Sequence, residues 1–98
     1  MEISDVDLRL SSQRALWGHV TPSLRSASIE YRGSVIYWRC LFNQDANQDD
    51  LELAREAGTE ILSDFPDVKE FKEDIRVVPF PEKLINLKNL VYYHHELL

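Results

Sequence analysis

Residues 47–66 read NQDDLELAREAGTEILSDFP, a pattern typical of an amphipathic helix. Asn47 is a suitable N-cap, and Asp50, three residues on, completes a capping-box-like pair. Pro66 stops the helix, because a proline ring is incompatible with a helix interior. Between these ends, apolar or small residues recur at helical spacing and predict one buried face, formed by Leu51, Ala54, Gly58, Ile61, Leu62 and Phe65.

The opposite face of this helix carries a column of carboxylates at intervals of four residues: Glu52, Glu56, Glu60 and Asp64. Each like-charge pair at this spacing costs an isolated helix about 0.2–0.5 kcal/mol, so stability alone would favour alternating charges. Arg55 is the only cation in the helix. The acidic column is therefore either a solvated face that keeps the protein soluble or a recognition surface for a basic partner.

The acidity of the chain is local. Residues 44–74 hold eleven carboxylates against three cations, a net charge of −8, whereas the remaining residues sum to +2. The overall charge of −6 argues against general binding to nucleic acid or to anionic membranes, and it favours a basic partner. Four further aspartates extend the patch around the column: Asp45, Asp49, Asp50 and Asp67.

A first helix is predicted over residues 5–17, with Ser4 as a possible N-cap and Gly18 at its end. A shorter helix that begins after Ser11 is the alternative. The apolar residues that recur at helical spacing in this segment are Val6, Leu10, Ala15 and Trp17.

Two strands are predicted next. In residues 26–31 polar side chains alternate with apolar ones, which indicates a strand whose wet face carries Ser26, Ser28 and Glu30. Residues 32–34 give a tight turn signal, and residues 35–42 form the most β-prone run of the chain. We assign one side of that second strand to the core: Ile36, Trp38, Cys40 and Phe42.

Two more strands are predicted after the acidic helix, at residues 71–78 and 90–95, with a loop or short helical turn around residues 82–89. The order αββαββ predicts an α+β fold: a two-layer single domain over residues 1–98, with about four strands in a mainly antiparallel sheet and two helices. If both helices cover one face of the sheet, the other face leaves Tyr37 and Arg39 in solvent.

The expected location is the cytoplasm. A single cysteine, Cys40, excludes an intramolecular disulfide and points to a reducing compartment. Residues 1–6 lack the apolar region of a secretion signal, and no run approaches the roughly 18 apolar residues of a membrane span.

The chain has little that points to catalysis. His94 and His95 are adjacent, so on a strand they face opposite ways and cannot jointly ligate one metal in the usual manner. Cys40, on the apolar side of a strand, is better interpreted as a core residue than as a nucleophile. Three glycines form no phosphate loop. We expect no enzyme, no cofactor and no metal; a small enzyme that uses one histidine with a carboxylate is the rival.

Three stretches stand out in chain order: QRALWGHVTPSLR at residues 13–25, EILSDFP at residues 60–66, and VPFPEKL at residues 78–84 with LVYY at residues 90–93. Together they resemble small bacterial immunity proteins of contact-dependent growth inhibition (CdiI-like) systems and related toxin loci. This resemblance implies a non-enzymatic, cofactor-free protein that binds the toxic C-terminal domain of a cognate CdiA-like effector, very often a nuclease. It does not assign the binding residues.

The acidic patch and the resemblance point to the same hypothesis. A nuclease domain usually presents a basic substrate cleft, which an acidic surface complements. We therefore predict a protein that binds a basic toxin domain, without contacting nucleic acid or membrane directly, through Glu52, Glu56, Glu60 and Asp64, with Asp45, Asp49, Asp50 and Asp67 extending the surface. A homodimeric module that pairs through its open sheet face or last strand is the alternative.

Overall fold

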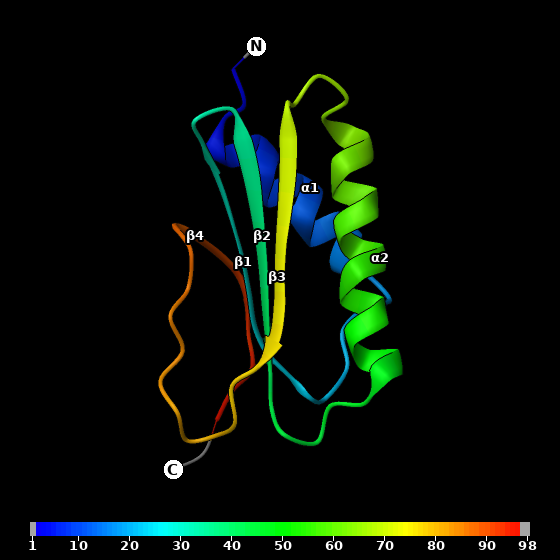
Figure 1. Ribbon diagram of the computed structural model, residues 1–98, viewed down its shortest axis with the longest axis vertical. Helices are drawn as coiled ribbons and strands as arrows, with labels where there is room; N and C mark the ends of the chain where they lie inside the picture. The colour runs from blue at the N-terminus through cyan, green and yellow to red at the C-terminus, as the bar shows by residue number, and fades with distance from the viewer. Residues whose placement is uncertain (1, 97–98) are drawn as a thin grey trace.

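A computed structural model describes residues 2–96, and Figure 1 shows a sheet with two helices packed against it. The elements are α1 (Asp5–Leu16), β1 (Leu24–Arg32), β2 (Val35–Phe42), α2 (Gln48–Asp64), β3 (Glu70–Val77) and β4 (Asn89–Tyr93). The predicted α+β class and the order αββαββ are thus confirmed. Within residues 2–96, no helix combines the length and the apolar composition that a membrane crossing requires.

The four strands form one mixed sheet in the order β3-β2-β1-β4. β1 is antiparallel to both β2 and β4, whereas β3 is parallel to β2. The parallel pair follows from α2, which carries the chain back along the sheet between the two strands (Figure 1). β1 and β2 are joined through Gly33 and Ser34, both with positive φ, as expected of the two-residue turns that match the twist of an antiparallel pair.

The acidic helix has the predicted ends. The Asn47 side chain accepts from the Asp50 backbone N–H at 2.9 Å, and the Asp50 carboxylate accepts from the Asn47 N–H at 3.2 Å. The helix ends at Asp64, two residues before the proline. Its buried face is Ala54, Ala57, Gly58 and Ile61, so the prediction was wrong for Leu62, which is 40 % exposed.

α2 lies unusually close to the sheet at Gly58, which the sequence placed on the buried face of the helix. A Cβ atom built there would lie 3.1 Å from Cδ1 of Trp38, which is tighter than ordinary van der Waals contact. The Trp38 indole N–H also donates to the Ala54 carbonyl of α2 at 3.1 Å. Together these contacts fix α2 over β2.

The first helix spans Asp5–Leu16 and begins at Ser4, whose side chain accepts from the Asp7 N–H at 3.0 Å, so the shorter alternative is excluded. Its predicted apolar face was largely wrong, because only Ala15 of that set is buried. The helix instead buries a face of two leucines and three small residues: Leu8, Ser11, Ser12, Ala15 and Leu16. Small side chains in the middle of that face allow the helix backbone to come close to its neighbours.

The core side of β2 is confirmed, since Ile36, Trp38, Cys40 and Phe42 are each 2 % exposed or less. Buried residues of both helices join the same hydrophobic cluster, which places α1 and α2 on one face of the sheet. In Figure 1, α1 crosses behind the strands and α2 runs beside β3.

The second face of the sheet is covered in part, contrary to the expectation of a wet face on β1. Ser26 and Ser28 are fully buried beneath the segment of residues 78–88, which returns the chain from β3 to β4. The Ser26 hydroxyl donates to the Asn86 side chain at 2.7 Å, and the Ser28 hydroxyl accepts from the Leu87 N–H at 2.9 Å. On β2, Arg39 is half-buried, and it donates to the Ile85 carbonyl at 2.9 Å.

A buried ion pair anchors the end of the described chain. Arg25, 4 % exposed, donates through Nε and Nη2 to the two carboxylate oxygens of Glu96, at 2.6 and 3.1 Å. The same guanidinium donates to the Val78 carbonyl at 2.6 Å and lies 5.6 Å from the Phe80 ring centroid. Residues 78–80 and Glu96 are thereby held to β1.

The last two strands lie close to their predicted positions. β3 begins and ends one residue earlier than expected, and β4 begins one residue earlier and ends at Tyr93, so His94 and His95 lie beyond the strand. Residues 78–88 contain no helix, which settles the choice between a loop and a helical turn in favour of a loop.

Candidate functional site

The acidic column lies on the solvent side of α2. The side chains of Glu52, Glu60 and Asp64 are 63 %, 56 % and 41 % exposed, and Glu56 is exposed as well. The opposite side of the helix is the buried face against β2 and β3. The column therefore points away from the sheet and is open to a partner.

The four members of the column differ in how they are engaged. Glu52 pairs with Arg55 at 3.2 Å, and Glu60 lies 3.6 Å from Nδ1 of His19, at the end of α1. Among residues 2–96, Glu56 has no cationic side chain within ion-pair distance. Glu56 is thus the member with the most freely available charge.

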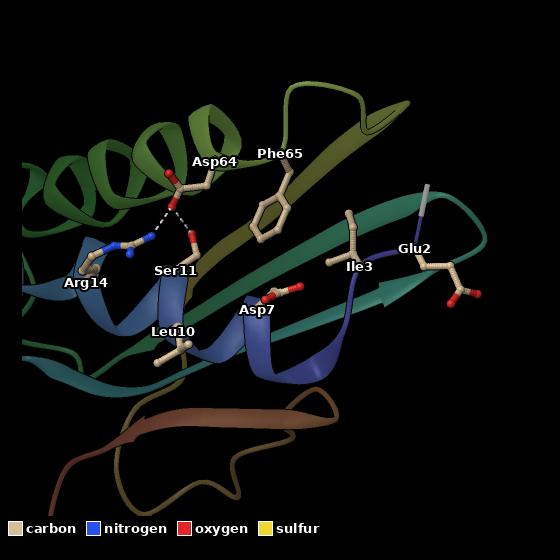
Figure 2. Close-up of a pocket in the computed structure, with 8 residues that line it drawn as sticks. All are labelled: Glu2, Ile3, Asp7, Leu10, Ser11, Arg14, Asp64 and Phe65. Carbon is tan, nitrogen blue, oxygen red and sulfur yellow. Dashed lines mark hydrogen bonds and ion pairs between the residues drawn. The ribbon is translucent and has the colours of Figure 1, made fainter.

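Asp64 holds the two helices together. Figure 2 shows its carboxylate reaching two side chains of α1: the Ser11 hydroxyl donates at 2.6 Å and the Arg14 guanidinium at 2.9 Å. The hydrogen bond from Ser11, assisted by Arg14, lowers the pKa of Asp64 below its ordinary value. Asp64 therefore has a structural role between the helices in addition to its place in the column.

The four additional aspartates lie at the two ends of the helix. Asp50 is half-buried, serves in the capping box and accepts from the Ser23 hydroxyl at 2.8 Å. Asp45 and Asp49 are exposed at the N-terminal end of α2, and Asp67 is exposed beyond its C-terminal end. Because 17 helical residues extend over about 25 Å, these carboxylates are too widely separated to converge on one small ligand.

An exposed apolar stripe on α1 was not predicted as surface. Val6, Leu10 and Trp17 are 53 %, 55 % and 87 % exposed, and we name these three residues the α1 stripe. Their spacing of four and seven residues places them along one side of the helix, as the sequence indicated. The spacing could identify the stripe but could not say whether it faced the sheet or the solvent.

A shallow hollow of about 390 Å³ lies between α1 and the end of α2 (Figure 2). Its apolar lining comes from Ile3, Leu10 and Phe65, while Glu2, Asp7 and Asp64 supply carboxylates against the single cation of Arg14. The hollow thus continues the acidic character of α2 onto α1.

The residues considered for catalysis are not brought together. Within residues 2–96, no group of three or more His, Cys, Asp or Glu side chains has the geometry of a metal site. His94 and His95 are exposed, and Cys40 is fully buried. Burial raises the pKa of the Cys40 thiol, and the nearby carboxylates of Glu73 and Asp74 raise it further, so the reactive thiolate is disfavoured.

The comparisons with known proteins give one family. No curated protein matches this chain. A model of the family described as MafI2 immunity protein matches residues 5–96, which is nearly the whole sequence. The resemblance to immunity proteins is thereby confirmed at that level, whereas the assignment to contact-dependent growth inhibition stays a prediction. The chain belongs to the MafI2 immunity protein family.

Proposed function

We propose that this chain neutralises a protein toxin by binding a basic nuclease domain of that toxin with its acidic surface. The family match over residues 5–96 carries the proposal, because it supports toxin neutralisation by a non-enzymatic inhibitor. The toxin would be the C-terminal domain of an effector of the CdiA type or of a related locus, and inhibition would take place in the cytoplasm of the producing cell.

The exposed carboxylates of α2 supply the electrostatic part of this function. The helix carries six carboxylates and one arginine. Such a field steers a basic partner toward the surface and raises the association rate, an effect that salt weakens. In a nuclease, the row of carboxylates would contact the cationic side chains that otherwise bind the phosphates of the nucleic acid.

The proposal predicts that a toxin gene lies next to the gene for this chain. The upstream gene should encode a long toxin or toxin fragment, and co-expression of the chain should rescue cells from its toxic domain. A neighbourhood of unrelated metabolic genes, together with absence of rescue, would reject the proposal.

Charge reversal tests the acidic surface itself. Glu56→Lys and the control Glu82→Lys each change the net charge from −6 to −4, and both glutamates are exposed, but Glu82 lies in the segment on the other side of the sheet. We expect Glu56→Lys to slow association with the toxin domain several-fold at low salt, and the control to have a smaller effect. Equal effects of the two variants would show that only net charge matters and would remove α2 from the binding surface.

The enzyme alternative has a direct test. Replacement of both His94 and His95 by alanine should leave protection against the toxin intact, because neither residue belongs to the proposed surface. Loss of protection in a folded double variant would favour the histidine-based enzyme.

A further inference from the structure

Trp17 is the most exposed large apolar side chain among residues 2–96, and its exposure indicates a role in contact with another protein. At 87 % exposure it covers almost nothing within its own fold. A tryptophan in water forgoes a large hydrophobic contribution, and tryptophan is enriched among the residues that dominate protein interfaces. Leu10 and Val6 continue the same side of α1 and lengthen the apolar contact that Trp17 begins.

The α1 stripe lies near the acidic column, with Arg14, which pairs with Asp64 and lines a hollow with Leu10 and Trp17, between them. His19, two residues after Trp17, contacts the Trp17 carbonyl at 3.2 Å through Nδ1, and the same atom is 3.6 Å from Glu60 of α2. In the middle of the stripe, Leu10 lines the hollow that also contains Asp7 and Asp64. An apolar strip is therefore bordered by carboxylates near Trp17 and near Leu10.

The negative charge of α2 favours a basic protein over a second copy of this chain as the partner on this surface. α2 carries a net charge of −5 over its own residues, and α1 is neutral. A second copy of this chain placed symmetrically on the same face would bring two such helices together and be opposed by like charge. A basic protein surface with an apolar pocket is complementary to both parts of the face.

We infer that the toxin domain docks across α1 and α2 together, with Trp17 inserted into an apolar pocket of the toxin. Leu10 and Val6 extend this contact. The hollow beside Leu10 receives a lysine or arginine of the toxin, whose aliphatic stem lies against Ile3 and Phe65 while its charged group faces Asp7 (Figure 2). This inference rests on the proposed function and names the anchoring residues within it.

The test compares Trp17→Ala with Ile85→Ala. Both side chains are large, apolar and exposed, at 87 % and 66 %, but Ile85 lies in the segment on the opposite side of the sheet. The probe is the inactivated toxin domain encoded beside this gene, and association and dissociation rates are measured for each variant. Circular dichroism and the urea midpoint of each variant check that the fold is retained.

We expect Trp17→Ala to raise Kd at least about 30-fold, mainly through faster dissociation, because interface anchors act on complex lifetime. Ile85→Ala should stay within about twofold of the wild type, as expected for a residue outside the interface. Glu56→Lys should act mainly on the association rate, which separates the steering role of the column from the anchoring role of Trp17.

Three results would overturn the inference. Equal affinities of Trp17→Ala and wild type would remove the stripe from the interface, while binding by the wild type would leave the proposed function in place. A wild-type homodimer that Trp17→Ala converts to a monomer, with toxin affinity unchanged, would assign the stripe to a second copy. Absence of wild-type binding and protection would reject the proposed function and the inference together.

Discussion

The buried pair of Arg25 and Glu96 gives the most direct test of how this fold is held together. Their side chains are only 5 % and 12 % exposed and meet through two hydrogen bonds, at 2.6 and 3.1 Å. Replacing Glu96 by glutamine keeps the size of the side chain but leaves the Arg25 charge without its counterion. Removal of one partner of a buried pair typically costs about 3–5 kcal/mol.

The expected loss is smaller than that range, for a structural reason. Arg25 keeps its bond to the Val78 carbonyl at 2.6 Å and its contact with the Phe80 ring, and the glutamine oxygen can still accept one hydrogen bond. We therefore expect Glu96→Gln to lower the free energy of unfolding by about 2 kcal/mol. In a domain of this size, that corresponds to a fall of about 8–16 °C in Tm.

The pH dependence of the free energy of unfolding gives a second, independent test of the Arg25–Glu96 pair. The hydrogen bonds from Arg25 lower the pKa of Glu96 in the folded state. The stabilisation of the fold by ionised Glu96 is therefore fully present above the ordinary glutamate pKa of about 4.3. It is lost as the pH falls through the lower pKa that Glu96 has in the folded state. The difference between wild type and Glu96→Gln should accordingly be full at pH 7 and shrink in acid below about pH 4.

Urea denaturation at pH 7 and at stepwise lower pH measures both effects. Glu82→Gln is the matched control: an exposed carboxylate without an ion-pair partner among residues 2–96, expected to change stability by less than about 0.5 kcal/mol. A loss of less than about 0.5 kcal/mol for Glu96→Gln at pH 7, or a difference that stays constant into acid, would refute the reasoning.

Two further predictions concern the core. Gly58→Ala should destabilise the protein by about 1–2 kcal/mol despite the better helix propensity of alanine, because the added Cβ would lie 3.1 Å from Cδ1 of the fully buried Trp38 and would force the indole or the helix to shift. Urea denaturation of this variant and of Thr59→Ala, which changes the neighbouring exposed residue, tests this, and a stabilised Gly58→Ala would contradict it. Cys40 should resist thiol reagents in the native state and react only after denaturation, because burial raises the pKa of its thiol. Mass spectrometry measures the modification, and rapid modification of the native protein would contradict this prediction.

Local signals in the sequence were sufficient for the element order and for α2. The capping box of Asn47 and Asp50 and the stop at Pro66 each depend on residues within one helical turn, so they are legible without tertiary information. The core side of β2 was predictable for a similar reason, since strand periodicity assigns alternate residues to one face. The acidic column was likewise visible as a pattern on a single helix.

The sequence alone could not predict which faces of α1 and β1 are buried, because that depends on packing between segments far apart in the chain. α1 has two faces that could pack on the sheet. The face with Leu8 and Leu16 is buried, because the small residues between them permit close approach. That choice turned Trp17 outward and created the α1 stripe. Similarly, Ser26 and Ser28 have the pattern of a wet strand face, and only the return of residues 78–88 across the sheet buries them.

The placement of β4 beside β1 has a consequence for how the molecule assembles. Ser26 pairs with Tyr93, and the pair of Arg25 and Glu96 spans 71 positions of sequence, whereas β1 and β2 are joined by a two-residue turn. Closing so large a loop carries a high entropic cost before its contacts repay it, so the local hairpin should order early and β4 should dock late. α1 packs on β4 as well, through Arg9 and Asn89 at 3.1 Å. The packing of α1 is therefore completed only when β4 docks, in one of the last steps of folding.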